Sequence, residues 1–263
     1  GLDPCSRYLT GAAALALADA GMRTGGAAGQ KMGLVAGVNH VSAESNAALV
    51  RTIRDRGYRG MSASLFSRMV LNAPVGTCSK LLGIKGALST VSAGDAAGLL
   101  AILYAAELAA TRPELDAILA GGVDELPPGD VAPGAGEGAA CVVLAGTRPA
   151  ARTAVRLAGS GIAGPGRIEA AARAALAAAA LEPDALDAVV GTVPAALVPA
   201  AVRRIDPDEL AGASEAFTSA LAFVIGSLLV RSGAARRVLV ARAGGGSADC
   251  AIALVREEEL HAA

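Results

Sequence analysis

The residues from Lys85 to Ala110 read KGALSTVSAGDAAGLLAILYAAELAA, and this stretch decides the fold. It begins with a β-prone run at residues 87–92, turns at two small residues, and enters at Asp95 a helix that is apolar nearly all round. A helix without a polar face is typical of the protein interior, so we expect it to be buried on all sides at the centre of the fold. Aspartate is among the best N-cap residues, and the simplest role for Asp95 is to cap this helix.

A strand, a tight turn and a buried helix also form the usual mount for a nucleophile. The turn exposes one side chain at the N-terminus of the helix. There the helix dipole and the free N–H groups favour negative charge, which would activate a cysteine or a serine. This sequence holds Asp95 at that position. The sequence therefore predicts the mount without its nucleophile.

Residues 90–99 resemble the nucleophile elbow of the β-ketoacyl synthases, whose pattern runs roughly T-V-S-T-A-C-S-S-G-L, with Asp95 in place of the catalytic cysteine. Further stretches resemble motifs of the same family in the right order. They are residues 72–76 (N-x-P-A-G), 82–86 (L-G-x-x-G-P), 120–125 (A-G-G-x-D) and 136–140 (G-E-G-A-A). On these motifs the chain is identified as a member of the family.

The rest of the chain predicts alternating helices and strands. A helix from Asp3 to Ala20 has Asp3 as N-cap and ends at Gly21; a loop at 24–30 leads to a strand at 32–38. We further expect helices at 44–54, 73–82, 167–180 and 212–231, and strands at 115–121, 138–145, 154–160, 187–192, 237–242 and 249–255. This alternation is typical of parallel βαβ units with a sheet covered on both faces.

The resemblance sharpens this α/β prediction to the thiolase-like fold, with five layers in the order α-β-α-β-α and two βαβ-type halves. We expect an N-terminal half at residues 1–146 and a C-terminal half at 153–263, joined by a short crossover at 147–153. Family members carry a further strand and hairpin before the first helix. The resemblance therefore implies a reduced or truncated form of the fold, shortened again between residues 122 and 137, near the active site.

Composition limits the class of function. Hydrophobic residues make up 53% of the 263 residues and aromatic residues only 2%, so the core is built from small and aliphatic side chains. A net charge of −1 argues against nucleic acid or an anionic membrane surface as a partner. The apolar runs are judged too short or too interrupted to span a bilayer. Cysteines without CxxC spacing predict no metal site, no disulfide framework and a reducing cytoplasm; they are Cys5, Cys78, Cys141 and Cys250. No cofactor is expected.

The resemblance implies a condensing site that this sequence has lost. An active family member needs a thiolate, two histidines (or histidine and asparagine) and an oxyanion hole. The first histidine motif, A-H-G-T-G-T, falls on residues 188–194, where Gly191 occupies the degenerate position. The second, K-x-x-x-G-H-x-x-G-A, falls on residues 212–220, with Glu215 at the histidine position. Neither His40 nor His261 falls on a family histidine, so we expect no condensation.

The same resemblance gives the candidate substrate-binding positions. Residues 243–249 resemble the glycine-rich turn G-F-G-G-T-N, with glycine in place of the gating phenylalanine, although a plain turn between two core strands explains them as well. Glu215 reads equally as a capping or ion-paired carboxylate. If it shares a pocket with Asp95, mutual repulsion should raise one pKa. Cys78 lies inside a predicted helix and reads as a core residue. The candidate substrate-binding residues are Asp95, Thr192, Glu215, Phe217, Gly245 and Gly246.

Three hypotheses of function follow. The first is a non-catalytic subunit, like the chain-length factors of polyketide synthases, that forms a heterodimer with an active ketosynthase through the strand at 87–92 and contacts acyl carrier protein. The second is an enzyme of acyl transfer or hydrolysis that uses Asp95 and Glu215, against which the short 122–137 loop counts because it admits water. The third is a homodimeric scaffold that binds an acyl ligand without turning it over.

Overall fold

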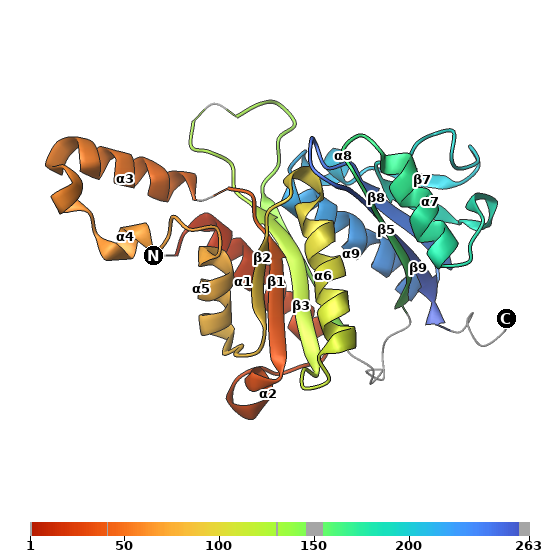
Figure 1. The fold of residues 1–263 in the computed structure, drawn as a ribbon, viewed down its shortest axis with the longest axis horizontal. Helices are drawn as coiled ribbons and strands as arrows, with labels where there is room; N and C mark the ends of the chain where they lie inside the picture. Colours follow the sequence, from red (N-terminus) through yellow and green to blue (C-terminus); the bar gives the residue numbers. More distant parts are fainter. Residues whose placement is uncertain (1, 41, 130, 146–154, 258–263) are drawn as a thin grey trace.

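Two β-sheets and three layers of helix make up the protein in the computed structural model, which describes residues 2–40, 42–129, 131–145 and 155–257 (Figure 1). The first sheet has the strand order β2-β1-β3-β4 and the second the order β5-β9-β8-β6-β7. The first sheet comprises β1 (Met32–Gly37), β2 (Leu88–Val91), β3 (Ala117–Asp124) and β4 (Gly138–Ala145). The second comprises β5 (Val155–Ala163), β6 (Ala188–Gly191), β7 (Arg203–Ile205), β8 (Arg237–Arg242) and β9 (Asp249–Arg256).

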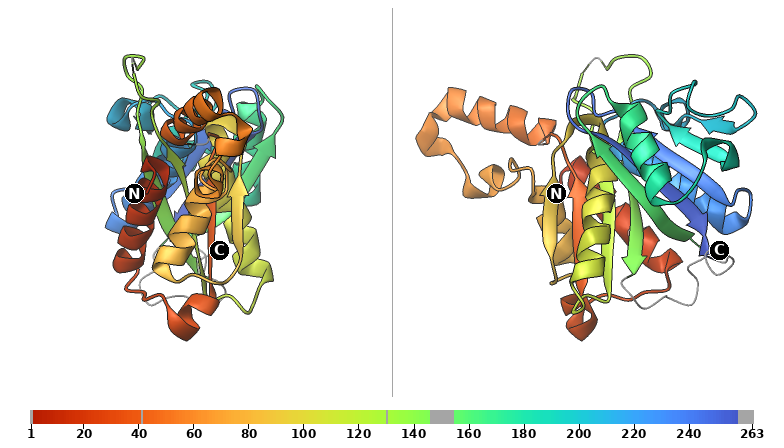
Figure 2. Two further views of the ribbon diagram at one scale, coloured as in Figure 1. Left: turned by 90° about the vertical axis from the view of Figure 1, so that its left-hand side faces the viewer. Right: turned by 45° about the vertical axis from the view of Figure 1, so that its right-hand side comes forward.

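The helices form layers because each sheet needs both faces covered. The outer face of the first sheet packs against α1 (Pro4–Asp19) and α5 (Ala73–Leu82). The outer face of the second packs against α7 (Ile168–Ala178). Between the two sheets lie α6 (Ala97–Thr111) and α9 (Ala216–Ser232), whose side chains join both sheets in one core (Figure 2). The layer order is therefore α-β-α-β-α, as the resemblance implies.

Shorter elements connect these layers. Helices α3 (Ala43–Arg56) and α4 (Ala63–Phe66) project from the side of the molecule next to β2 and α5 (Figure 1). The remaining short helices are α2 (Gly26–Gln30), η1 (Tyr58–Gly60), η2 (Gly94–Ala96), η3 (Pro183–Ala185) and α8 (Pro207–Ala211).

Several predicted elements are confirmed in detail. Asp3 caps α1 by accepting the N–H of Ser6 at 2.8 Å, and Gly21 follows the end of the helix at φ +66°. Helix α5 spans the predicted residues 73–82 and is followed by Gly83 in the left-handed conformation, which glycine adopts without strain. Strand β8 also has the predicted bounds.

Other predictions are wrong. The 24–30 loop contains α2, β3 continues three residues past its predicted end to Asp124, and α9 begins at Ala216 rather than 212. The unassigned stretch before α9 contains β7 and α8. The sheets are mixed rather than wholly parallel. Strand β4 pairs antiparallel with β3, and β9 pairs antiparallel with both β8 and β5. The crossover predicted at 147–153 lies outside the described residues, as does His261.

The central helix also differs from its prediction. Its side toward solvent carries Tyr104, 41% exposed, so α6 is not buried on all sides. By length and apolar composition alone, Gly94–Thr111 could cross a membrane once, although the apolar runs were predicted to be too short or too interrupted for this. In the fold, these residues enter the core between the two sheets, and a core helix meets the same test of composition.

Two glycines let the central helices meet at the end of β3. A Cβ on Gly98 of α6 would lie 2.1 Å from the carbonyl oxygen of Ala216, and so would a Cβ on Gly122 of β3. Only a residue without a side chain allows this approach. Ser219 fixes it by accepting the N–H of Gly98 at 3.0 Å. The N-termini of α6 and α9 are therefore held side by side.

Candidate functional site

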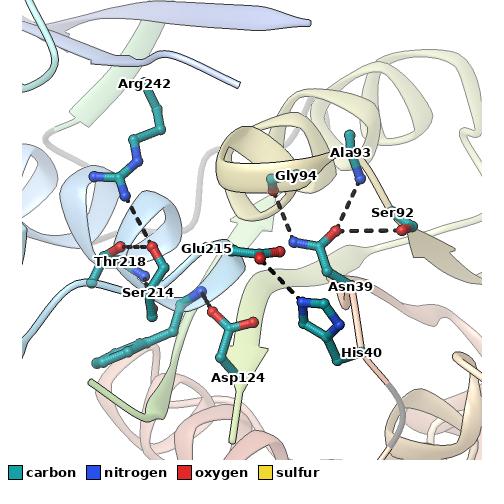
Figure 3. A network of polar contacts seen from close by, with 11 residues as sticks. Asn39, His40, Ser92, Ala93, Gly94, Asp124, Ser214, Glu215, Thr218 and Arg242 are labelled. Atoms are coloured by element: carbon teal, nitrogen blue, oxygen red, sulfur yellow. Dashed lines mark hydrogen bonds and ion pairs between the residues drawn. The ribbon is translucent and has the colours of Figure 1, made fainter. Parts of the chain in front are cut away.

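Asn39 and His40 follow the carboxyl end of β1 and begin the site (Figure 3). The side-chain amide of Asn39 donates to the carbonyl of Gly94 at 2.9 Å, and its oxygen accepts the N–H of Ala93 at 3.1 Å and the hydroxyl of Ser92 at 3.3 Å. One side chain at the end of β1 thereby fixes the turn that leads from β2 into α6.

The glycine-rich turn between β8 and β9 lies directly on this elbow. A Cβ on Gly94, which has φ +57°, would lie 2.5 Å from the carbonyl oxygen of Gly244. A Cβ on Gly245 would lie 2.7 Å from a carboxylate oxygen of Asp95. The Ser247 hydroxyl donates to the carbonyl of Ala93. The predicted turn therefore joins the two halves of the chain at the elbow as well as connecting two strands.

Asp95 lies at this contact between the elbow and the glycine-rich turn. It does not cap α6, so the predicted capping role is wrong. The elbow residues form the 3₁₀ turn η2, and Ala96, which has no side-chain cap, precedes the helix. Burial raises the pKa of the Asp95 carboxyl. The guanidinium of Arg242 lowers that pKa, while Glu215 and Asp208 raise it. The direction agrees with the expectation from mutual repulsion, but desolvation is the larger cause.

Glu215 stands at the start of α9 and makes an ion pair instead of a cap. Its carboxylate lies 3.0 Å from Nε2 of His40, with side-chain exposures of 37% and 70%. The alternative of an ion-paired carboxylate is therefore correct. His40 is one of the site residues that the family motifs did not place. Its position after β1 was the available signal, because the carboxyl ends of parallel strands meet at one edge of a sheet.

Asp124 ends β3 in the same place and is 9% exposed. Its carboxylate accepts the N–H of Phe217 at 2.8 Å. Burial raises the pKa of Asp124, although the N–H of Phe217 and the hydroxyl of Ser214 lower it in part. The Phe217 ring packs in the core against Gly138, so this predicted substrate-binding residue reaches the site through its backbone.

A buried arginine supports the segment before α9. Arg242, 7% exposed, donates to Asp208 at 2.8 Å and to the carbonyl of Ser214 at 2.9 Å. Gly191 and Thr192 lie at the corresponding end of the neighbouring strand β6, where the N–H of Thr192 donates to Ala241 at 2.8 Å. Gly246, at φ +109°, faces open space. The structure thus brings Asp95, Glu215 and Gly245 together with His40, Asp124 and Arg242.

The cysteines lie elsewhere. Cys78 is fully buried in α5, and burial raises its pKa to about 11. Burial likewise raises the pKa of Cys5, at the start of α1, and of Cys250, in β9. Cys141 lies in β4. Within the described residues, no cluster of three or more histidine, cysteine or acidic side chains could hold a metal ion. The site therefore consists of carboxylates, one imidazole and one guanidinium.

Comparison with known proteins identifies the family. Residues 1–133 match the sequence profile described as "Beta-ketoacyl synthase, N-terminal domain", which is just over half of the chain. The chain belongs to the β-ketoacyl synthase family. No curated protein sequence matches it.

Solved ketosynthase structures share the fold over nearly the whole chain. The ishigamide ketosynthase/chain length factor has a TM-score of 0.77 and 21% identity, over 97% of this chain and 81% of that one. A β-ketoacyl synthase from Burkholderia phymatum has a TM-score of 0.78 and 19% identity, over 96% and 82%. The ketosynthase of AntDE:AntF, a complex with a type II polyketide synthase acyl-carrier protein, has a TM-score of 0.76 and 18% identity, over 97% and 84%. These structures confirm the thiolase-like fold of this β-ketoacyl synthase family member.

Proposed function

We propose that this protein is a ketosynthase-like subunit of polyketide or fatty-acid biosynthesis that does not itself condense acyl units. The observation that carries the proposal is the carboxylate of Asp95 at the elbow, packed under the glycine-rich turn. A carboxylate there cannot form the thioester that holds the growing chain. It also fills with negative charge the helix N-terminus that would otherwise stabilise a thiolate. Gly191 and Glu215 supply no imidazole to polarise a malonyl carbonyl.

Such a subunit would act in the cytoplasm as the partner of an active β-ketoacyl synthase. The outer edge of β2 supports this, because β2 pairs with β1 on one side only and ends the described first sheet. Leu88 on this strand is 46% exposed. An edge strand with unpaired backbone groups is ready to pair across a two-fold axis. Acyl carrier protein is the further partner, and the halves 1–146 and 153–263 would fold as two lobes of one subunit.

Co-expression with an active ketosynthase from the same organism tests the proposal. We expect a stable one-to-one complex on size-exclusion chromatography with light scattering. A Leu88→Lys variant should lose the complex while keeping its own circular dichroism spectrum. The control Leu210→Lys, on α8 and more exposed than Leu88, should keep the complex. A well-behaved homodimer that ignores the ketosynthase would overturn the partner role and leave the acyl-binding scaffold.

A second candidate, acyl transfer or hydrolysis by Asp95 and Glu215, is favoured by two observations. Burial raises the pKa of Asp95, and the Glu215–His40 pair lies at the same edge of the sheet. A carboxyl with a raised pKa is suited to general acid–base catalysis. Turnover of decanoyl-N-acetylcysteamine that is lost in both Asp95→Asn and Glu215→Gln would establish this activity. Turnover unchanged in both variants, or none in the parent protein, would exclude it.

A further inference from the structure

A groove of about 680 Å³ lies between β7, α8 and the C-terminal half of α9. The strand and the two helices supply its apolar floor, which consists of Ile205, Leu210, Ile225, Leu228 and Leu229. Leu210 is 67% exposed and Leu228 is 46% exposed. A helix as apolar as α9 needs cover on nearly every side. The described residues leave this side of α9 partly uncovered.

The two ends of the groove carry opposite charges. Helix α9 runs back along the parallel strands after β7, so its last turn, with Arg231, lies at the end of the sheet where β7 begins at Arg203. Asp206 and Glu209 follow the other end of β7, and Asp206 already serves as the N-cap of α8. The groove therefore has a basic end and an acidic end, with the apolar floor between them.

Arg203 is the cation that the groove leaves available to a ligand. Arg231 donates to the carboxylate of Asp19, and Arg204 donates to the carbonyl of Val193 at 2.9 Å. The side chain of Arg203 is exposed, and the described residues offer it neither a hydrogen bond nor an ion pair. A guanidinium binds a carboxylate through two parallel N–H donors. The ligand that fits this end therefore carries an anionic head on an apolar body.

We propose that the groove binds a free medium-chain fatty acid, whose carboxylate meets Arg203 and whose alkyl chain lies along Leu228 and Leu229. Burial of the chain supplies the affinity, and the charge of Arg203 fixes the orientation of the ligand. A nucleic acid is disfavoured, because the described lining residues include no aromatic side chain for a base to stack on, and Asp206 and Glu209 repel phosphates.

This binding site is separate from the proposed function. Strand β7 and α8 lie on the side of the molecule opposite β2 and α3 (Figure 1). Glu215 of the candidate site stands at the N-terminus of α9, whereas the groove lies along the C-terminal half of that helix. Fatty-acid binding can therefore succeed or fail whatever partner binds at β2.

Calorimetric titration of the full chain with three amphiphiles of equal chain length tests the chemistry. The probes are decanoate, decanol and decyltrimethylammonium, each kept below the concentration at which it forms micelles. We expect decanoate to bind at one site, about tenfold more tightly than either of the others, because only decanoate forms a charge-assisted pair with Arg203. Equal or tighter binding of decanol or of the cation would overturn the proposal.

Three variants locate the bound ligand. Arg203→Gln should weaken decanoate binding about tenfold, whereas the control Arg167→Gln, at an exposed arginine before α7, should leave it unchanged. Ser227→Phe fills a different cavity, of about 230 Å³, which Ser227 lines between α1, α9 and β4, and it should also leave decanoate binding unchanged. Circular dichroism checks that each variant is folded.

The remaining outcomes all count against the proposal. Binding that Ser227→Phe abolishes and Arg203→Gln spares would place the ligand in the cavity beside β4. Binding to phosphatidylglycerol vesicles without binding of free decanoate would make a membrane surface the ligand. A dimer on light scattering that Leu210→Ser dissociates would mean that a second copy covers the groove. Failure to bind decanoate at all would likewise overturn the site, and it would leave the partner role of the subunit untouched.

Discussion

The two halves of the molecule use the same order of strands but complete it differently. The C-terminal half closes its sheet with β5, and β9 is buried along its length, whereas β4 of the N-terminal half ends its sheet half-covered. At the opposite end, the halves contribute equally: α6 and α9 both begin at the site, each with a carboxylate, Asp95 and Glu215, that caps neither helix. Within the described residues, the two halves therefore match at the shared centre and differ at the periphery.

The helix contact at this centre should be the least tolerant of change. A Gly98→Ala substitution places a methyl group 2.1 Å from the carbonyl of Ala216, so α6 and α9 must move apart. We expect a loss of about 3 kcal/mol in the free energy of unfolding, measured by urea denaturation. Gly76→Ala in α5 is the control, because nothing lies within 4 Å of its Cβ, and it should raise stability by about 0.5–1 kcal/mol. Equal effects would mean that the close approach is absent in solution.

The second-largest contrast should be between Leu144 of the edge strand β4, which pairs with Ile118 of β3, and Leu254 of the inner strand β9, which pairs with Val238 of β8. Leu254→Ala removes a fully buried side chain from β9 and should cost about 3 kcal/mol, whereas Leu144→Ala in β4 should cost about 1 kcal/mol. Urea denaturation of both variants measures the difference. If the two substitutions cost the same, β4 is covered in solution as fully as β9, and the contrast between the halves disappears.

Asp95 should give a smaller, pH-dependent effect. Burial raises its folded-state pKa above the ordinary value of about 3.9, so the folded protein binds this proton more tightly than the unfolded chain does. The resulting stabilisation is complete below the unfolded value and is lost as pH rises through the folded value. Asp95→Asn should therefore raise the unfolding midpoint at pH 7, with the gain shrinking toward pH 4. Asp55→Asn, on the exposed face of α3, is the control, and parallel pH curves for Asp95→Asn and the parent would contradict the expectation.

The ion pair between His40 and Glu215 should have the smallest effect on the free energy of unfolding. His40 is exposed and Glu215 is partly exposed. Ion pairs that water can reach contribute little, because water screens them and ordering both side chains has an entropic cost. A double-mutant cycle of His40→Ala and Glu215→Ala should give a coupling energy of about 0.5 kcal/mol or less. A coupling of several kcal/mol would show that the pair, rather than the glycine contacts, holds the two halves together.

Local patterns predicted the fold well where a helix or strand has its own signals. Helix α5 was bounded correctly because Pro74 lies in its first turn and Gly83 follows its last residue. The edge strand β7 was missed because Arg203, Arg204 and Ile205 show no apolar alternation and pair only with β6. The mixed sheets were missed because alternation of helices and strands does not reveal the direction of a strand reached without an intervening helix, as β4 is from β3.

The site was predictable in part. Motif resemblance selected Asp95, Glu215 and Gly245, and the structure brings these three together. Pairing His40 with Glu215 could not be predicted, because 175 residues separate them and only the packing of α9 against the first sheet makes them neighbours. The 3₁₀ turn that displaces Asp95 from the N-cap was likewise set by contact with Gly244, which lies in the other half.

The placement of α9 has a consequence for synthesis of the chain on the ribosome. The inner face of the first sheet is covered in part by side chains of α9, such as Phe217. The ribosome adds these residues to the chain long after it has added β3. At the usual elongation rate the nascent N-terminal half would wait on the order of ten seconds for them. During that interval the inner side of α6 and the sheet would be open to solvent. The emerging chain would therefore be a natural client for a ribosome-associated chaperone until its last quarter is complete.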